Sequence, residues 1–159
     1  MSAATLKGVF GVKFPVSDLA RSRAWYARVF GWEADYEFPD EDGIVRGASG
    51  HLAGVTGTFL ALRENPPAAR GVAGADLINL LVEDRSSLEA WVARLDELGI
   101  DHSPLIDATI GWLLVLHDPD GIELHLYTSE RHGIDQSGRP GYGRAVAHDR
   151  NTPAEPPGW

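Results

Sequence analysis

The chain has 159 residues, of which 43% are hydrophobic. This length and composition suit one domain with one core better than two independent domains. It contains no cysteine, which excludes a disulfide framework and thiolate chemistry, and its net charge of −9 argues against nucleic-acid binding, which needs clustered Lys and Arg. No apolar run reaches the roughly 18 residues of a membrane span, and the first residues lack the apolar region of a secretory signal, so we expect a cytoplasmic protein.

A first module is expected from about residue 7 to 65, and it opens with a strand. Apolar residues occur at every second position: Phe10, Val12, Phe14 and Val16. This period of two places them on one face of a sheet. A helix is expected from near Ser17 to Gly31, followed by strands over 32–38, 44–48 and 58–63.

A Pro-rich linker over 65–74 is expected to lead into a second module, residues 75–130. Its first strand alternates through Ile78, Leu80 and Val82. Ser86 and Glu89 fit a capping box, and the helix that they open is expected to end at Gly99. Three strands follow over 102–106, 112–117 and 122–128, and the turn 118–121 between the last two reads Asp-Pro-Asp-Gly.

The two modules repeat one another at a constant offset of 66 residues. Asp18 and Trp25 of the first module correspond to Asp84 and Trp91 of the second, and the Val, Ala and Arg residues around them match at the same offset. A repeat of this length indicates a duplicated supersecondary unit. We interpret Trp25 and Trp91 as core residues between helix and sheet.

Beyond Arg131 the chain changes to Gly, Pro and polar residues. Residues 131–159 are therefore predicted to form a tail outside the modules, either disordered or laid along the surface. Such a tail would suit a strap across a homodimer.

The order βαβββ–βαβββ, the strand that leads through Val-x-Asp into a helix, and the Asp-Pro-Asp-Gly hairpin together resemble the vicinal-oxygen-chelate (glyoxalase/bleomycin-resistance/dioxygenase) superfamily. The resemblance covers residues 7–130 and implies an α+β fold of two tandem modules that form a mixed-sheet cavity for a small-molecule ligand. It also implies that the protein dimerises.

Metalloenzymes of this family bind one divalent ion through His, Gln or Glu, and the resemblance identifies the corresponding positions here. They are Gly11, Leu77, His125 and one residue in 62–64. Gly11 and Leu77 cannot coordinate a metal, whereas a catalytic metal generally keeps about three protein ligands. We therefore expect no metal cofactor. The alternative is a divergent site for Zn, Ni, Fe or Mn that uses His125 and Glu64.

The alternation along the strands places a polar set on the cavity face: Lys13, Asn79, Glu123, His125 and Tyr127. Among these, His125, Lys13 and Glu123 are candidates for proton transfer, with His125 as the acid or base. Asn79 and Tyr127 are candidate ligand-binding residues. Trp32 and Trp112 each begin a strand and are predicted either to edge the pocket and stack on a planar ligand or to pack within the sheet.

Three functions suit these features. The first is a metal-free binding protein of the bleomycin-resistance type that sequesters an aromatic or cationic compound. The second is an enzyme, either a lyase or isomerase that uses His125 as acid or base, or a dioxygenase-type enzyme that uses it as a metal ligand. The third is a structural dimer with a collapsed cavity, which the polar cavity face disfavours.

Overall fold

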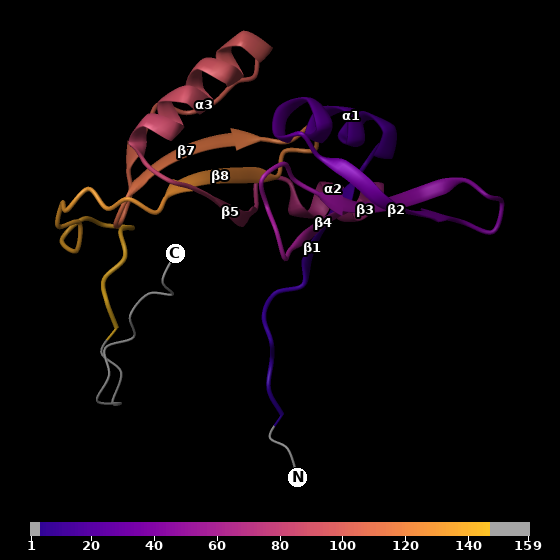
Figure 1. Ribbon diagram of the computed structural model, residues 1–159, viewed down its shortest axis with the longest axis horizontal. Coiled ribbons are helices and arrows are strands. Elements are labelled where there is room, and N and C mark those ends of the chain that lie inside the picture. The colour runs from indigo at the N-terminus through magenta and orange to yellow at the C-terminus, as the bar shows by residue number, and fades with distance from the viewer. Residues whose placement is uncertain (1–3, 147–159) are drawn as a thin grey trace. The chain divides into compact units, whose positions relative to one another are not determined.

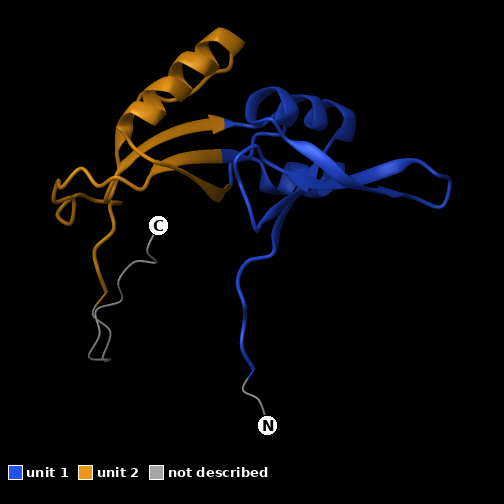
Figure 2. Cartoon of the chain, viewed as in Figure 1, with its two compact units in different colours: residues 1–75, 117–123 blue, residues 76–116, 124–159 orange. Residues whose placement is uncertain are grey.

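A computed structural model describes residues 4–146 of the chain. These residues form two compact units, shown in different colours in Figure 2. The first unit contains the residues up to 75 together with 117–123, and the second contains 76–116 and the residues from 124 onward. No helix among the described residues is long and apolar enough to cross a membrane.

The first unit is a four-stranded sheet with two helices (Figure 1). Its elements are β1 (Gly11–Val16), α1 (Leu19–Phe30), β2 (Glu33–Pro39), β3 (Val45–His51), β4 (Phe59–Glu64) and α2 (Pro66–Val72). The strand order is β1-β4-β3-β2, in which β1 runs parallel to β4 and the other neighbours are antiparallel. This is the predicted βαβββ arrangement.

The second unit repeats the same arrangement. Its elements are β5 (Asp76–Val82), α3 (Arg85–Leu98), β6 (Ile106–Asp107), β7 (Trp112–His117) and β8 (Glu123–Thr128). The strand order β5-β8-β7-β6 matches that of the first unit position by position. The predicted α+β fold with a duplicated βαβββ module is thus confirmed.

The strand predicted over 102–106 forms only in part. A single bridge joins His102 to Leu116, and the regular pairing is limited to Ile106 and Asp107. Pro104 has no backbone N–H to donate to the neighbouring strand, which is the physical reason for the gap.

Each long helix begins directly after an aspartate. The side chains of Asp18 and Asp84 accept hydrogen bonds from the backbone N–H three residues later, at 2.9 and 2.8 Å. The capping box predicted for Ser86 and Glu89 is therefore wrong, because the Asp84 carboxylate already occupies the N-cap position. The aspartate that repeats at an offset of 66 is thus the helix cap of each module.

The predicted linker also differs, because most of it is the short helix α2. The Asn65 side chain accepts a hydrogen bond from the backbone N–H of Ala68 at 3.2 Å, and Pro66 occupies the first helical position. A proline at that position forfeits no helical hydrogen bond, so a Pro-rich segment can begin a helix as well as end one.

The core lies on the even-numbered face of β1 and β8, as the alternation predicts. Phe14 and Val16 of β1 are at most 1% exposed, and so are Leu124 and Leu126 of β8. The odd-numbered face is open: Leu77 and Leu81 of β5 are 45% and 56% exposed.

The prediction that Trp25 and Trp91 are core residues is wrong, since both are only half-buried. The buried stripe of α1 instead contains Tyr26, Val29 and Phe30. Trp25 precedes that stripe by one residue, or about 100° around the helix, which leaves it at the boundary with solvent.

The first part of the predicted tail packs against the second unit. Residues 131–146 contain no helix or strand, yet Gln136 is 3% exposed and its amide donates to the carbonyl oxygen of Asp107 at 3.3 Å. His132 Nε2 lies 2.8 Å from the carbonyl oxygen of Ala108. The remainder of the predicted tail lies outside the described residues.

Candidate ligand-binding site

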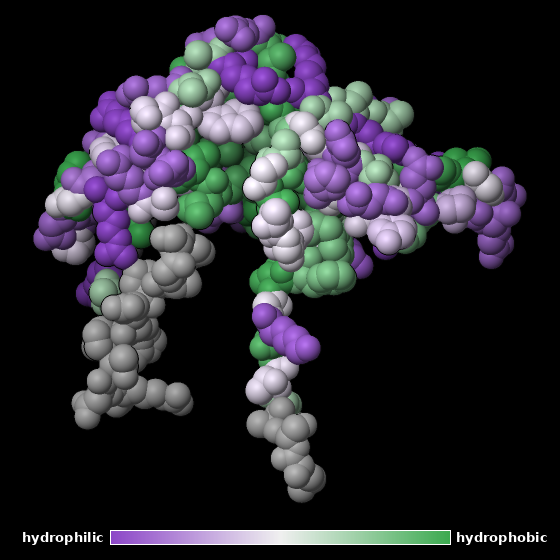
Figure 3. Space-filling view, in the orientation of Figure 1, coloured by the Kyte–Doolittle hydropathy of each residue, from purple (hydrophilic) through white to green (hydrophobic). Residues whose placement is uncertain are grey.

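The second unit contains a cavity of about 250 Å³ at the end of β5 and β8. Its walls come from both strands, the loop before β7 and the segment that follows β8. The lining residues are Asn79, Leu80, Leu81, Ile110, Tyr127, Thr128, Ser129 and Arg131. Figure 3 shows hydrophobic side chains gathered over the strands of the second unit, below the hydrophilic surface of α3. The cavity is thus mainly apolar with a few polar groups, which is the usual character of a small-molecule site.

Tyr127 fixes one wall of this cavity. Its phenolic oxygen accepts hydrogen bonds from the backbone N–H groups of Ile110 and Gly111, at 3.1 and 3.4 Å. Among residues 4–146 no acceptor is found for the phenolic O–H itself. A held phenol with a hydrogen left to donate is suited to an oxygen of a ligand.

Asn79 and Arg131 are two further polar residues of the lining, beside Thr128 and Ser129. Both are exposed, and Arg131 is the sole charged residue among those that line the cavity. The amide can donate and accept, whereas the guanidinium only donates. This lining therefore favours a ligand with acceptor oxygens over a cationic one.

Sequence reasoning placed Asn79 and Tyr127 on one face, and the structure brings both to the lining of one cavity. It missed Ile110 and Arg131, because both lie in loops whose positions no alternation reveals. Only the pairing of the strands shows that these loops close the cavity.

The three predicted proton-transfer residues are divided between the units. Lys13 and Glu123 belong to the first unit and His125 to the second. Within the first unit, Glu123 lies 3.6 Å from His117, while Lys13 is exposed. Neither unit by itself assembles the trio.

His125 has an acidic neighbour that the sequence did not suggest. Its Nδ1 lies 3.6 Å from a carboxylate oxygen of Asp76, and its side chain is 13% exposed against 51% for Asp76. A carboxylate beside one ring nitrogen can orient an imidazole whose other nitrogen transfers a proton. The pair joins β5 to β8, which is why sequence distance concealed it.

Trp32 and Trp112, expected either to edge the pocket or to pack within the sheet, both contact protein groups. Trp32 is 3% exposed and its indole N–H donates to the carbonyl oxygen of Leu60 at 3.1 Å, so it belongs to the core of the first unit. The guanidinium of Arg85 lies over the ring of Trp112, with its central carbon 5.7 Å from the ring centroid, and His132 meets the same ring edge-on. Neither lines the cavity of the second unit.

The family's metal does not fit the residues at its expected positions. Leu77 offers no ligand atom, and a Cβ placed on Gly11 would lie 2.3 Å from the ring of Phe59. That ring thus fills the space into which a ligand side chain would extend. Within residues 4–146, no group of three or more His, Cys, Asp or Glu is placed to hold a metal ion.

Glu64, the other residue of a divergent site, is already engaged. Its two carboxylate oxygens bind the backbone N–H of Leu19 at 3.0 Å and the guanidinium of Arg46 at 2.5 Å. These two donors hold the pKa of Glu64 below its ordinary value. The carboxylate therefore stabilises the start of α1, in place of the ligand role that the divergent site required.

Several solved structures share this fold. A glyoxylase/bleomycin resistance protein/dioxygenase domain from Frankia sp. EAN1pec is 24% identical, with a TM-score of 0.60 over 79% of this chain and 100% of that chain. TnmS3, an antibiotic binding protein from Streptomyces sp. CB03234, is 23% identical, with a TM-score of 0.63 over 79% of this chain and 98% of that chain. Lactoylglutathione lyase from Agrobacterium tumefaciens is 16% identical, with a TM-score of 0.62 over 82% of this chain and 100% of that chain.

No curated protein matches the chain. Residues 9–126, however, match the Glyoxalase/Bleomycin resistance protein/Dioxygenase superfamily over most of the chain. The extent of this match agrees with the 7–130 range over which the sequence resembles that superfamily. Together with the duplicated βαβββ units, it shows that the chain belongs to the glyoxalase/bleomycin-resistance/dioxygenase superfamily.

Proposed function

We propose that this protein binds and sequesters a small aromatic compound in the cavity of the second unit, without the divalent metal of the family's enzymes. The observation that carries the proposal is the cavity lining, in which apolar walls surround Tyr127 and Asn79. A planar molecule with an acceptor oxygen would bury its ring against Leu81 and Ile110 and accept from the Tyr127 phenol. The resemblance to an antibiotic binding protein is consistent with such a role.

The missing metal ligands support binding over metal-dependent catalysis. Gly11 with Phe59 above it, and Leu77 on the open face of β5, give apolar surface where the family's enzymes present ligand atoms. Apolar surface stabilises a ligand by removing it from water, at about 25 cal/mol per Å². A cationic compound, the other kind of ligand expected from the sequence, would find no carboxylate in the cavity lining.

Titration with 7-methoxycoumarin, a neutral planar probe with a carbonyl oxygen, tests the cavity directly. We expect Tyr127→Phe to weaken binding by about fivefold to tenfold, since it removes one neutral hydrogen bond. Asn79→Ala should have an effect of similar size. Tyr36→Phe is the matched control, because Tyr36 is 70% exposed on β2 of the first unit. Equal affinities in Tyr127→Phe, Asn79→Ala and Tyr36→Phe would refute the assignment of the cavity.

The pair of His125 and Asp76 favours a second candidate, a metal-free lyase or isomerase with His125 as the acid or base. In that case His125→Ala abolishes turnover of the bound compound but leaves its affinity within about threefold, because the imidazole would act mainly in the transition state. If the protein only sequesters its ligand, the compound is recovered unchanged from wild type and variant alike.

A further inference from the structure

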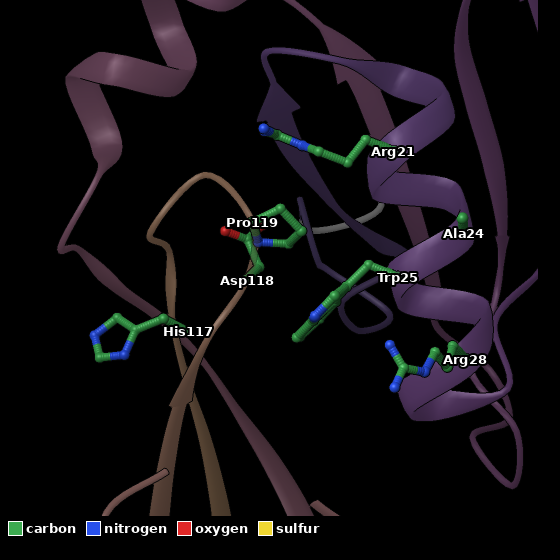
Figure 4. Close-up of a pocket in the computed structure, with 7 residues that line it drawn as sticks. All are labelled: Arg21, Ala24, Trp25, Arg28, His117, Asp118 and Pro119. Carbon is green, nitrogen blue, oxygen red and sulfur yellow. The ribbon is translucent and has the colours of Figure 1, made fainter. Parts of the chain in front are cut away.

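A second pocket lies in the first unit, apart from the proposed ligand cavity. It has a volume of about 450 Å³ and is formed by one face of α1 and the turn after β7. Figure 4 shows the Trp25 indole reaching from α1 toward that turn, with Arg21 and Arg28 on either side of it along the helix. His117, Asp118 and Pro119 form the opposite wall.

The charge of this pocket differs from that of the chain as a whole. Although the net charge is −9, the helix from Leu19 to Phe30 contains three arginines and no acidic residue. Arg21 and Arg28 line the pocket, and both are exposed. Guanidinium groups are the preferred partners of carboxylate, sulfonate and phosphate oxygens, which they bind through paired N–H donors.

The acidic residue in the opposite wall is buried and hydrogen-bonded within the protein. Asp118 is 5% exposed, and its Oδ2 accepts from the hydroxyl of Tyr26 at 3.0 Å. Its Oδ1 accepts from the backbone N–H groups of Asp120 and Ile122, both at 2.9 Å. Three donors of the protein thus stabilise this carboxylate, and Arg21 and Arg28 are the exposed Arg, Lys, Asp or Glu residues of the lining.

Arg21 is partly compensated by the turn. One of its terminal nitrogens lies 2.9 Å from Asp120, and the side chain is nevertheless 48% exposed. A guanidinium has five N–H donors, so this ion pair leaves others for a ligand. The pair also orients the guanidinium beside the pocket.

Trp25 provides a rigid apolar surface between the two cations. Its indole meets the rings of Tyr26 and Phe30 in T-shaped contacts, with centroid distances of 4.9 and 5.8 Å. The ring is therefore held in place while remaining half-buried. An aromatic ligand ring is well suited to pack against such an indole.

The second module provides an internal comparison, because the repeat gives it the same Trp and Arg. On α3 the guanidinium of Arg94 lies over the ring of Trp91, and its central carbon is 5.9 Å from the ring centroid. The position equivalent to Arg21 is Ser87. A half-buried indole with arginines at both of these positions is thus specific to α1.

From this arrangement we propose that the pocket on α1 is a second binding site, for a planar aromatic anion. The aromatic ring packs against Trp25, and a carboxylate, sulfonate or phosphate group binds to Arg28 and Arg21. This site is independent of the cavity in the second unit, and either can exist without the other.

Calorimetric titration of the whole chain with naphthalene-2-sulfonate tests this proposal. Loss of one charge-assisted contact should make Arg28→Gln bind about tenfold more weakly, and Trp25→Leu should have at least as large an effect. Arg94→Gln and Trp91→Leu are the matched controls on α3 and should bind like wild type. Thermal unfolding of each variant checks that the substitution leaves the fold intact, so that a loss of affinity reports on the pocket.

Three results would overturn the second site. The first is the absence of measurable binding by wild type, and the second is an equal loss of affinity in the α1 and α3 variants. The third is an equally tight binding of naphthalene-2-methanol, the neutral analogue of the sulfonate. Asn79→Ala, which tests the cavity of the second unit, should leave the affinity for the sulfonate unchanged, so failure of one site is distinguishable from failure of the other.

Discussion

Replacing Asp118 by alanine is expected to destabilise the protein by about 3 kcal/mol, because it leaves several buried donors without an acceptor. The Asp118 carboxylate accepts hydrogen bonds from the hydroxyl of Tyr26 and from two backbone N–H groups of the turn. Chemical denaturation would measure the change in the free energy of unfolding. Asp101→Ala, an exposed aspartate, is the control and should change it by less than about 0.5 kcal/mol.

The same carboxyl group gives stability a definite dependence on pH. Burial raises the pKa of Asp118 above its ordinary value, and hydrogen bonds from Ile122 N–H and the Tyr26 hydroxyl offset this only in part. The folded state therefore binds the proton more tightly than the unfolded state does. The stability gained from this tighter proton binding is fully present below the pKa of the group in the unfolded state. It is lost as the pH rises through the raised pKa of the folded state.

Asp118→Asn removes this ionisation while keeping an acceptor for the turn. The difference in unfolding free energy between wild type and Asp118→Asn should therefore shift against wild type as the pH increases from about 4, the ordinary pKa of an aspartate. A difference that is constant with pH, or an Asp118→Ala variant as stable as Asp101→Ala, would show that this carboxyl group does not hold the turn.

Gly50 on β3 is expected to be the most sensitive glycine of the first unit. A Cβ at this position would lie 1.9 Å from the carbonyl oxygen of Glu33 on β2, which is backbone and cannot rotate away. Gly50→Ala must therefore separate two paired strands, at a cost of about 3 kcal/mol or more. Thermal or denaturant unfolding would detect this as a lower midpoint.

Gly71 offers the same substitution in open space. No atom lies within 4 Å of a Cβ placed there, and the residue is helical, in α2. Gly71→Ala should stabilise the protein by about 0.5 kcal/mol, because alanine favours a helix over glycine. If both alanine variants unfolded like wild type, the close approach of β2 to β3 at Gly50 would be wrong.

Much of the fold could be predicted from the sequence because the chain contains the same module twice. The repeat of Asp18 and Trp25 at Asp84 and Trp91 defines the module, and the alternation along β1 and β5 defines its inner and outer faces. The caps show the limit of local patterns. Ser86 fits a capping motif as well as Asp84 does, and only the path of the backbone decides between them.

The candidate site could be predicted only in part, because it depends on which strands and loops become neighbours. Alternation put Asn79 and Tyr127 on one face, and both line the cavity, but alternation says nothing about a loop residue such as Ile110. It also grouped His125 with Lys13 and Glu123, although strand pairing gives His125 the neighbour Asp76. Contacts between residues distant in sequence lie beyond any period of two.

The claim that ligand binding needs no metal can be tested by one comparison. The dissociation constant for 7-methoxycoumarin would be measured for the whole chain before and after exhaustive dialysis against a chelator. With Gly11, Leu77 and an engaged Glu64 at the family's ligand positions, we expect the two values to agree within about twofold. Loss of binding after chelation, with recovery on adding back zinc, nickel, iron or manganese, would contradict the proposed metal-free site.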